Sequence, residues 1–79
     1  MGIYEFYVLS INDKAEFIWQ SGSHLASVKE TESTYLLYST PNFYAEITMR
    51  ENKIEEINSF RSGHRLDKYV DKIKLEKLI

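Results

Sequence analysis

Side chains that could carry out acid–base or metal chemistry are few in this chain of 79 residues. The two histidines, His24 and His64, lie in unrelated parts of the sequence, and neither sits within a cluster of acids. A metal site or a general base needs such neighbours, because ligands and proton partners must converge on one point. The adjacent Glu55 and Glu56 would point to opposite faces of a strand and could not act on one substrate. We therefore expect no catalytic residue and no metal site.

Nucleophilic and phosphate-binding chemistry also lack their usual sequence signals. The chain has no cysteine, which excludes a disulfide framework, a thiolate zinc site and a cysteine nucleophile. No serine lies in a nucleophile-elbow pattern. Each glycine (Gly2, Gly22 and Gly63) stands alone, so no glycine-rich loop is available to bind phosphate. These features predict a non-enzymatic protein without a cofactor.

A strip of polar and aromatic side chains is the strongest binding signal in the sequence. In the run from 43 to 50, apolar residues alternate with a second set, which places that set on one face of a strand. Tyr and Arg are enriched where protein interfaces concentrate their binding energy. The expected partner is another protein or a second copy of the chain. The predicted partner-binding residues are Tyr38, Tyr44, Glu46 and Arg50.

Two other interpretations fit the same strip. The tyrosine rings could be buried under a C-terminal helix with their hydroxyls left in water. Alternatively, an open sheet with exposed aromatic rings could stack single-stranded bases, although no RNP-like run accompanies these tyrosines. The three interpretations differ in how far solvent reaches Tyr44 and its neighbours.

Charge is distributed unevenly along the chain, whose formal net charge is −2. Residues 1–60 hold four Lys or Arg and nine Asp or Glu, a net charge of −5, whereas residues 61–79 hold six and three, a net charge of +3. At helical spacing, the C-terminal cations form a basic stripe made of Arg61, Arg65, Lys68 and Lys72. This stripe is the alternative site, for nucleic acid. The negative charge of the whole chain disfavours that role, and a solvated face or a contact with the acidic body is the simpler explanation.

Length and composition indicate one small soluble domain, covering residues 1–79. A chain this short has room for one core, and its 43% hydrophobic content is enough to build it. No basic segment followed by an apolar run marks a secretory signal, and no stretch approaches the roughly 18 apolar residues of a membrane span. With no cysteine to oxidise, we expect the protein to lie in the cytoplasm without contacting a membrane.

The first third of the chain predicts a strand, a helix and a second strand. Residues 3–9 are rich in β-branched and aromatic residues, which favours a strand, with a short amphipathic helix as the alternative. Residues 13–21 favour a short helix that Asp13 would cap and Gly22 would end, with a hairpin strand as the alternative. Residues 24–30 predict the second strand.

The central segment predicts a β-hairpin with strands near 34–39 and 43–50. Its register depends on the length of the loop. A two-residue loop pairs Leu36 with Ile47, whereas a three-residue loop pairs Tyr35 with Ile47. The difference matters, because a shift of one residue turns every side chain to the other face of the sheet.

The last third predicts a strand and then a helix. Residues 54–60 place apolar side chains three apart, which fits a helix or a bulged strand, and we expect the strand because a turn directly precedes it. A helix is predicted from Ser62, because apolar residues recur at i, i+3, i+4 and i+7. These residues are Leu66, Tyr69, Val70 and Ile73.

Together, these elements predict an α+β fold. Short connections between consecutive strands favour antiparallel neighbours, since parallel pairs need long crossovers. We expect an antiparallel β-meander of four to five strands, with a C-terminal helix packed on one face. If residues 13–21 form a helix, the fold also contains a short N-terminal helix.

Four short patterns of packing residues occur along the chain. They are W-x-x-G-x-x-L-A from Trp19 to Ala26, L-Y at Leu37 and Tyr38, F-Y-x-E from Phe43 to Glu46, and L-x-x-Y from Leu66 to Tyr69. In these positions, the chain resembles a family of short uncharacterised bacterial proteins over most of its length. The resemblance implies a compact α+β domain and a bacterial origin, and it implies no particular activity.

Overall fold

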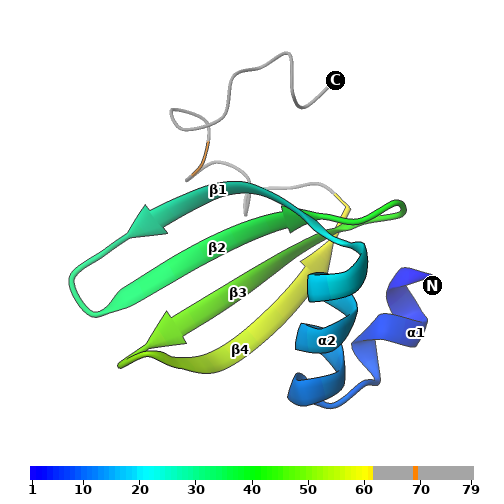
Figure 1. Ribbon diagram of the computed structural model, residues 1–79, viewed down its shortest axis with the longest axis horizontal. Coiled ribbons are helices and arrows are strands. Elements are labelled where there is room, and N and C mark those ends of the chain that lie inside the picture. Colours follow the sequence, from blue (N-terminus) through cyan, green and yellow to red (C-terminus); the bar gives the residue numbers. More distant parts are fainter. Residues whose placement is uncertain (62–68, 70–79) are drawn as a thin grey trace.

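In the part of the chain that the structure describes, two short helices are followed by a four-stranded antiparallel sheet (Figure 1). The computed structural model describes residues 1–61 and Tyr69. The helices are α1 (Ile3–Tyr7) and α2 (Ile11–Ser21), and the strands are β1 (Ser23–Lys29), β2 (Ser33–Ser39), β3 (Tyr44–Arg50) and β4 (Lys53–Phe60). The strand order β1-β2-β3-β4 confirms the predicted antiparallel meander, with four strands. The predicted C-terminal helix from Ser62 lies outside the described residues.

Residues 3–9 do not form the predicted strand, and the alternative helix is present instead as α1. The backbone N–H of Gly2 donates to Oε1 of Glu5 at 2.9 Å, and the N–H of Phe6 donates to the carbonyl of Gly2 at 3.1 Å. Phe6 is fully buried, while its neighbours Tyr4 and Tyr7 are exposed. The helical turn of about 100° per residue therefore separates the apolar residues, and a five-residue run is too short for periodicity to reveal this.

Helix α2 confirms the predicted helix at 13–21 and begins earlier, at Ile11. Its N-cap is Ser10 rather than Asp13, because the Ser10 hydroxyl accepts the N–H of Asp13 at 3.2 Å. Gly22 ends the helix and donates its N–H to the carbonyl of Ile18 at 2.8 Å. The φ of Gly22 is an ordinary −94°. Space explains the glycine, because a Cβ there would lie 2.8 Å from the Ile18 carbonyl oxygen.

The β2–β3 hairpin has the register of a two-residue loop. The N–H of Thr40 donates to the carbonyl of Phe43 at 2.8 Å and closes the turn around Pro41 and Asn42. Leu36 consequently lies opposite Ile47. Of the two registers that the sequence allows, the structure therefore has the one with the two-residue loop.

Each edge strand contains a β-bulge. In β4, Glu56 lies opposite Thr48 while Ile54 lies opposite Met49, which leaves Glu55 as the additional residue. This confirms the predicted bulged strand at 54–60. Strand β1 has its own register shift, between His24 and Ala26. Bulges disturb pairing at a sheet edge, so the regular part of β4 is 56–60.

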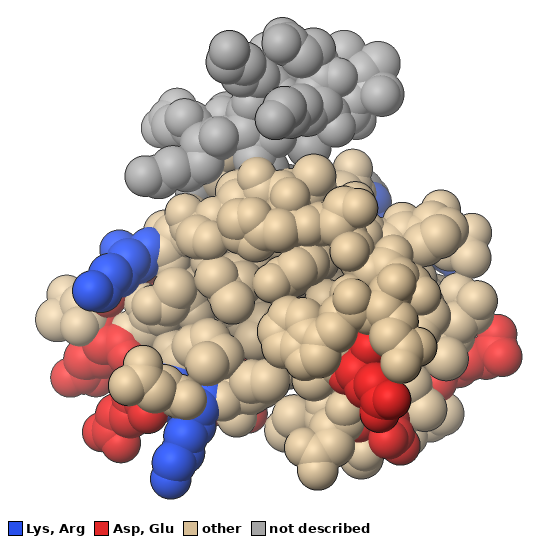
Figure 2. Space-filling view, in the orientation of Figure 1, with Lys and Arg blue, Asp and Glu red and all other residues tan. Residues whose placement is uncertain are grey.

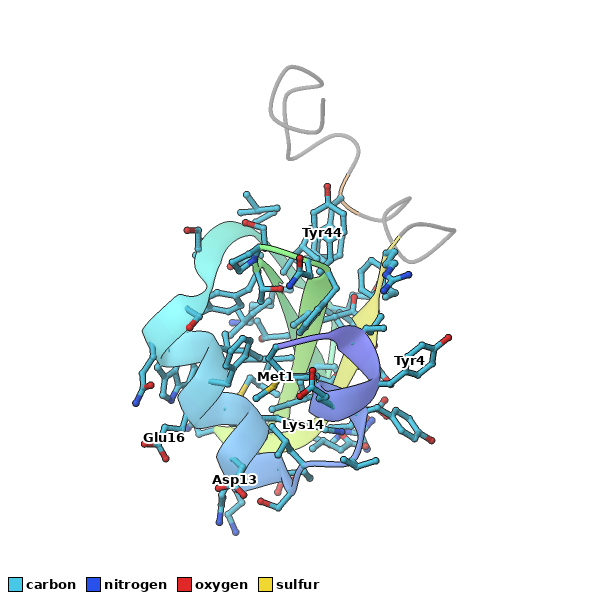
Figure 3. The ribbon with its side chains drawn as sticks, turned by 90° about the vertical axis from the view of Figure 1, so that its right-hand side faces the viewer. Met1, Tyr4, Asp13, Lys14, Glu16 and Tyr44 are labelled. Atoms are coloured by element: carbon cyan, nitrogen blue, oxygen red, sulfur yellow. The ribbon has the colours of Figure 1, made fainter. Side chains whose placement is uncertain are left out.

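The main hydrophobic core lies between the sheet and the two helices (Figure 3). Three phenylalanine rings meet there: the centroid of Phe6 is 5.0 Å from that of Phe43 and 5.7 Å from that of Phe17. Aromatic pairs at these separations attract each other in addition to burying apolar area. Phe6 thus anchors α1 to the sheet. The buried residues of this core are Phe6, Ala15, Ile18, Phe43, Ala45, Ile47 and Ile57.

The opposite face of the sheet carries a second buried cluster. It consists of Ala26, Leu37, Phe60 and Tyr69. Tyr69 is fully buried, and Leu37 below it is also fully buried. Both faces of the sheet therefore contribute to the stability of the fold.

Candidate interaction surface

The outward side of α1 exposes an unusual amount of apolar and aromatic surface. Tyr4, Tyr7 and Val8 are 82%, 71% and 78% exposed. Residues at i, i+3 and i+4 lie on one side of a helix, so these three form one patch, which we call the α1 patch. Figure 3 shows Tyr4 pointing away from α2. Grouped apolar residues on a surface mark interaction sites, whereas scattered ones are ordinary.

A cleft of about 490 Å³ lies between α1 and the end of β4. Its lining residues are Ile3, Tyr4, Tyr7, Ser59 and Arg61. This volume lies within the range of about 300–1,000 Å³ that is typical of binding sites. One wall is apolar and aromatic, and the other carries a hydroxyl and a guanidinium group. The cleft therefore offers an apolar contact and an anion contact side by side.

Arg61 supplies the positive charge in this cleft. Among the described residues it forms no ion pair, and the ion pair that is present joins Nε of Arg50 to Oε2 of Glu55 at 3.2 Å. Arg61 also lines a smaller cleft of about 300 Å³ at the β2–β3 loop. A guanidinium presents its N–H donors in a planar fork that matches a carboxylate. Arg61 is thus suited to bind an acidic group of a ligand.

Strand β4 borders the same cleft through Ser59, which lies opposite Ala45 on the helix-covered face of the sheet. Strand β4 is the last in the sheet, and no other described strand pairs with its outer side. An open edge presents unpaired N–H and C=O groups that can bind a further strand. In the regular part of β4 (56–60), Glu56 is the only charged residue. The α1 patch, the cleft and this edge are contiguous, and we call them together the α1–β4 surface.

Helix α1 is held in place by a cation as well as by its buried ring. Nζ of Lys14 lies 5.7 Å from the ring centroid of Phe6 and 5.5 Å from that of Tyr7. Figure 3 shows Lys14 between the two helices. Such cation–π contacts stabilise by about 0.5–1 kcal/mol at exposed sites. Lys14 therefore helps to orient the Tyr7 side of the α1 patch.

The predicted partner-binding residues lie on two faces of the sheet. Tyr44, Glu46 and Arg50 share one face of β3, away from the helices, whereas Tyr38 packs against the helix-covered core. Tyr44 is half-buried and Arg50 is exposed at the other end of the strand. Glu46, between them, is only 1% exposed. The structure thus brings three of the four residues onto one strand, and solvent reaches them mainly at its two ends.

Tyr38 belongs to an aromatic group at the β1 side of the sheet. Its ring centroid is 5.8 Å from that of Trp19 and 5.3 Å from that of His24, both edge-to-face. Nε2 of His24 is 2.8 Å from Oγ of Ser27. A serine–histidine contact is part of many nucleophilic sites, but no described carboxylate hydrogen-bonds to His24 to complete a triad. His24 is exposed and lies edge-to-face against Tyr38.

Glu46 takes part in a buried polar group on the second face. Oε2 of Glu46 accepts a hydrogen bond from the Tyr69 hydroxyl at 2.7 Å. Asn58 lies opposite Glu46 across β3 and β4, and its Nδ2 is buried without a hydrogen-bond partner among the described residues. Buried polar groups cost free energy unless they are hydrogen-bonded. The Tyr69 hydroxyl therefore helps to stabilise Glu46 in its buried position.

Of the predicted basic stripe, the structure describes Arg61 alone; the other three residues, Arg65, Lys68 and Lys72, lie outside the described range. On the face seen in Figure 2, charged side chains gather toward the ends and uncharged residues lie between them. Around a wide depression, charges of both signs are mixed; its charged lining residues are Lys29, Glu30, Glu32 and Arg50. Mixed charges give no uniform field for a polyanion. Nucleic-acid binding remains a prediction.

Within residues 1–61 and Tyr69, no three His, Asp or Glu side chains lie close enough together to hold a metal ion. No helix in these residues is long and apolar enough to cross a membrane.

No family model, no curated protein and no solved structure matches this chain. The resemblance to short bacterial proteins therefore stays a prediction. The functional conclusion rests on the geometry of the described residues.

The predicted strand at 3–9 gave no indication of the α1 patch, because in a strand Tyr4 and Val8 would share a face with Phe6. The helical spacing of Tyr4, Tyr7 and Val8 is the signal that points to it. The cleft itself has no sequence signal, because Arg61 is distant in the chain from the tyrosines that it joins.

Proposed function

We propose that this chain is a small non-enzymatic interaction module that binds another protein, or a second copy of itself, through the α1–β4 surface. The observation that carries this proposal is the exposure of Tyr4, Tyr7 and Val8, at 82%, 71% and 78%, beside β4, an edge strand with no described strand on its outer side. Exposed aromatic patches and bare strand edges both favour association. The absence of cysteine supports a cytoplasmic location.

The size of the α1 patch indicates what the partner must supply. Fully burying a large apolar side chain contributes about 1.5–3 kcal/mol, so covering the two tyrosines contributes about 3–6 kcal/mol. Association costs about 4–15 kcal/mol in lost freedom. The patch alone therefore gives weak binding at best, and a stable complex needs additional backbone pairing along β4. The patch and the edge are expected to act together.

The proposal is tested by removing the aromatic rings of the patch. The tagged wild type and the variant Tyr4→Ser/Tyr7→Ser are used to capture partners from lysate with nuclease added, and the mass of each in solution is measured by light scattering. We expect a discrete protein partner, or a dimer, for the wild type and its loss in the variant. Trp19→Ser is the matched control, since Trp19 is an exposed aromatic (57%) on α2 and outside this surface. Circular dichroism checks that every variant is folded.

The outcome that overturns the proposal is equally definite. If the double variant keeps the partner or the dimer of the wild type, the α1–β4 surface is not the site. If the wild type binds no protein and is monomeric at every concentration, the chain is not an interaction module.

The face of β3 is a second candidate surface for the same function. Tyr44 and Arg50 both reach solvent there, and these residue types are enriched at interfaces.

A further inference from the structure

We infer that the α1–β4 surface binds an extended segment of another protein that carries an acidic residue two positions before a large apolar residue. This inference rests on the proposed function and specifies the chemistry of the partner. It combines the open edge of β4 with the two walls of the adjoining cleft, both described above.

The backbone of the segment pairs with the outer edge of β4. The regular part of this strand, 56–60, follows the bulge at Glu55, and no described strand pairs with its outer side, although α1 and α2 both contact β4. Adding a strand to such an edge gives main-chain hydrogen bonds, while pockets for alternate side chains give specificity. Antiparallel pairing is the commoner and slightly more stable arrangement, so the segment runs antiparallel to β4.

The spacing of Ser59 and Arg61 sets the positions of the two recognised side chains. Ser59 lies in β4, Arg61 comes directly after Phe60, the last residue of the strand, and both residues line the cleft. The partner residue opposite Ser59 enters the cleft beside Tyr4 and Tyr7, and the small Ser59 side chain leaves room for a large apolar group. An antiparallel segment that continues past the end of β4 brings its residue two positions earlier beside Arg61. The motif is therefore acid–any–apolar, in that order.

The charges around the cleft favour a single acidic residue in the segment, beside Arg61. Arg61 is the cation of the cleft and has no ion pair among the described residues. The rest of the body is acidic, because residues 1–60 carry a net charge of −5. At the other end of the regular edge, Glu56 would repel an acid placed opposite it, since like charges on paired strands are destabilising. A generally acidic segment is thus disfavoured, and one acid opposite Arg61 is favoured.

Two synthetic peptides test this chemistry. Both are capped octapeptides of alternating Thr and Val with one Phe, and they differ only in having Asp or Lys two positions before that Phe. Each is titrated into the isotope-labelled chain and followed by NMR. We expect the Asp peptide to shift the amide signals of Tyr4, Tyr7, Ser59 and Arg61, and the Lys peptide to bind roughly five- to tenfold more weakly.

Charge reversal gives the decisive comparison. In Arg61→Glu the preference should invert, so that the Lys peptide binds more tightly than the Asp peptide. Lys53→Glu is the matched control, because Lys53 is an exposed cation of the same strand at its other end, and it should leave the preference unchanged.

Three results would overturn the inference: no binding of the Asp peptide, equal binding of both peptides, or a preference that Arg61→Glu leaves intact. A dimer that Tyr4→Ser/Tyr7→Ser abolishes and that excludes the peptide would assign the surface to a second copy. That result contradicts the external segment and leaves the proposed function standing. If neither peptide binds but a lysate partner is lost in Tyr4→Ser/Tyr7→Ser, the acid–any–apolar segment is likewise contradicted and the proposed function likewise stands.

Discussion

The hydroxyl of Tyr69 donates a 2.7 Å hydrogen bond to Oε2 of Glu46 at a point where both side chains are buried. The bond joins residues that are 23 positions apart. It lies on the face of the sheet opposite the helices, where Tyr69 packs with Leu37 and Phe60. The placement of Tyr69 on the sheet thus depends on a polar contact as well as on apolar packing.

Tyr69→Phe is predicted to lower the free energy of unfolding by about 1–3 kcal/mol, because it removes a buried hydrogen bond and keeps the ring. Urea denaturation measures the change. Tyr44→Phe is the matched control, since the Tyr44 ring stacks on Phe60 on the same face and is only half-buried. The control should change stability by less than about 0.5 kcal/mol. Equal losses in the two variants would show that the hydrogen bond to Glu46 contributes nothing specific.

Two substitutions in α1 should differ greatly in their effect on stability. Phe6→Ala empties a fully buried site in contact with two other rings and should cost about 3–5 kcal/mol. Tyr4→Ala removes a side chain that is 82% exposed and should stay within about 0.5 kcal/mol of the wild type. Thermal and urea unfolding measure both changes.

The stability of the whole domain makes this comparison sensitive. A chain of this length is expected to have a free energy of unfolding of roughly 4–12 kcal/mol, so Phe6→Ala removes a large fraction of it. Phe6→Leu, which keeps most of the volume, serves as a milder control. A loss in Tyr4→Ala comparable to that in Phe6→Ala would mean that Tyr4 is packed in solution and that the α1 patch is not exposed.

The sheet was predictable because its signals are local. Alternation along 43–50 identifies the faces of β3, and the turn residues between the two runs mark the hairpin. Its register was not fixed by these signals, because Pro41 and Asn42 fit loops of two lengths. The hydrogen bond from Thr40 to Phe43 decides between them, and no sequence pattern reports that bond.

The α1–β4 surface was not predictable for a different reason. The composition of a run as short as Ile3–Tyr7 does not distinguish a strand from a helix. The packing of Phe6 in the core favours the helix, and that packing is not visible in the local sequence. Residue types alone also place Glu46 in a binding strip, whereas its hydrogen bond to Tyr69 comes from a distant part of the chain. Burial is a property of the assembled fold, and spacing along one strand does not report it.

The double variant Tyr44→Ser/Arg50→Gln tests whether the partner binds the β3 face or the α1–β4 surface. Tyr44 and Arg50 stand at the two ends of a seven-residue strand, about 20 Å apart at 3.3 Å per residue, with buried Glu46 between them. Residues so separated do not form one compact binding centre, so the partner captured by the wild type should be retained. Losing the ion pair of Arg50 with Glu55 should cost at most about 1 kcal/mol of stability, because both groups are half exposed. Loss of the partner in a folded variant would move the site to the β3 face.

Nucleic-acid binding by the basic stripe has a quantitative signature in salt. If Arg61, Arg65, Lys68 and Lys72 all contact phosphates of a single strand, log K should fall with log salt at a slope of about −2.8. Between 50 and 200 mM salt, that slope lowers the affinity for a single-stranded oligonucleotide roughly 50-fold. The net charge of −5 on residues 1–60 opposes a polyanion, so we expect no measurable binding at the higher salt.

The variant Arg61→Glu should change both the oligonucleotide affinity and the peptide preference, in different ways. It should lower any oligonucleotide affinity at low salt and reduce the slope by about one, because one phosphate contact is lost. In the peptides it should invert the preference between Asp and Lys without abolishing binding, because the aromatic wall of the cleft is unchanged. Oligonucleotide binding that persists at 200 mM salt with the full slope in the wild type would identify Arg61 as part of a phosphate-binding stripe and would place nucleic acid ahead of protein as the partner.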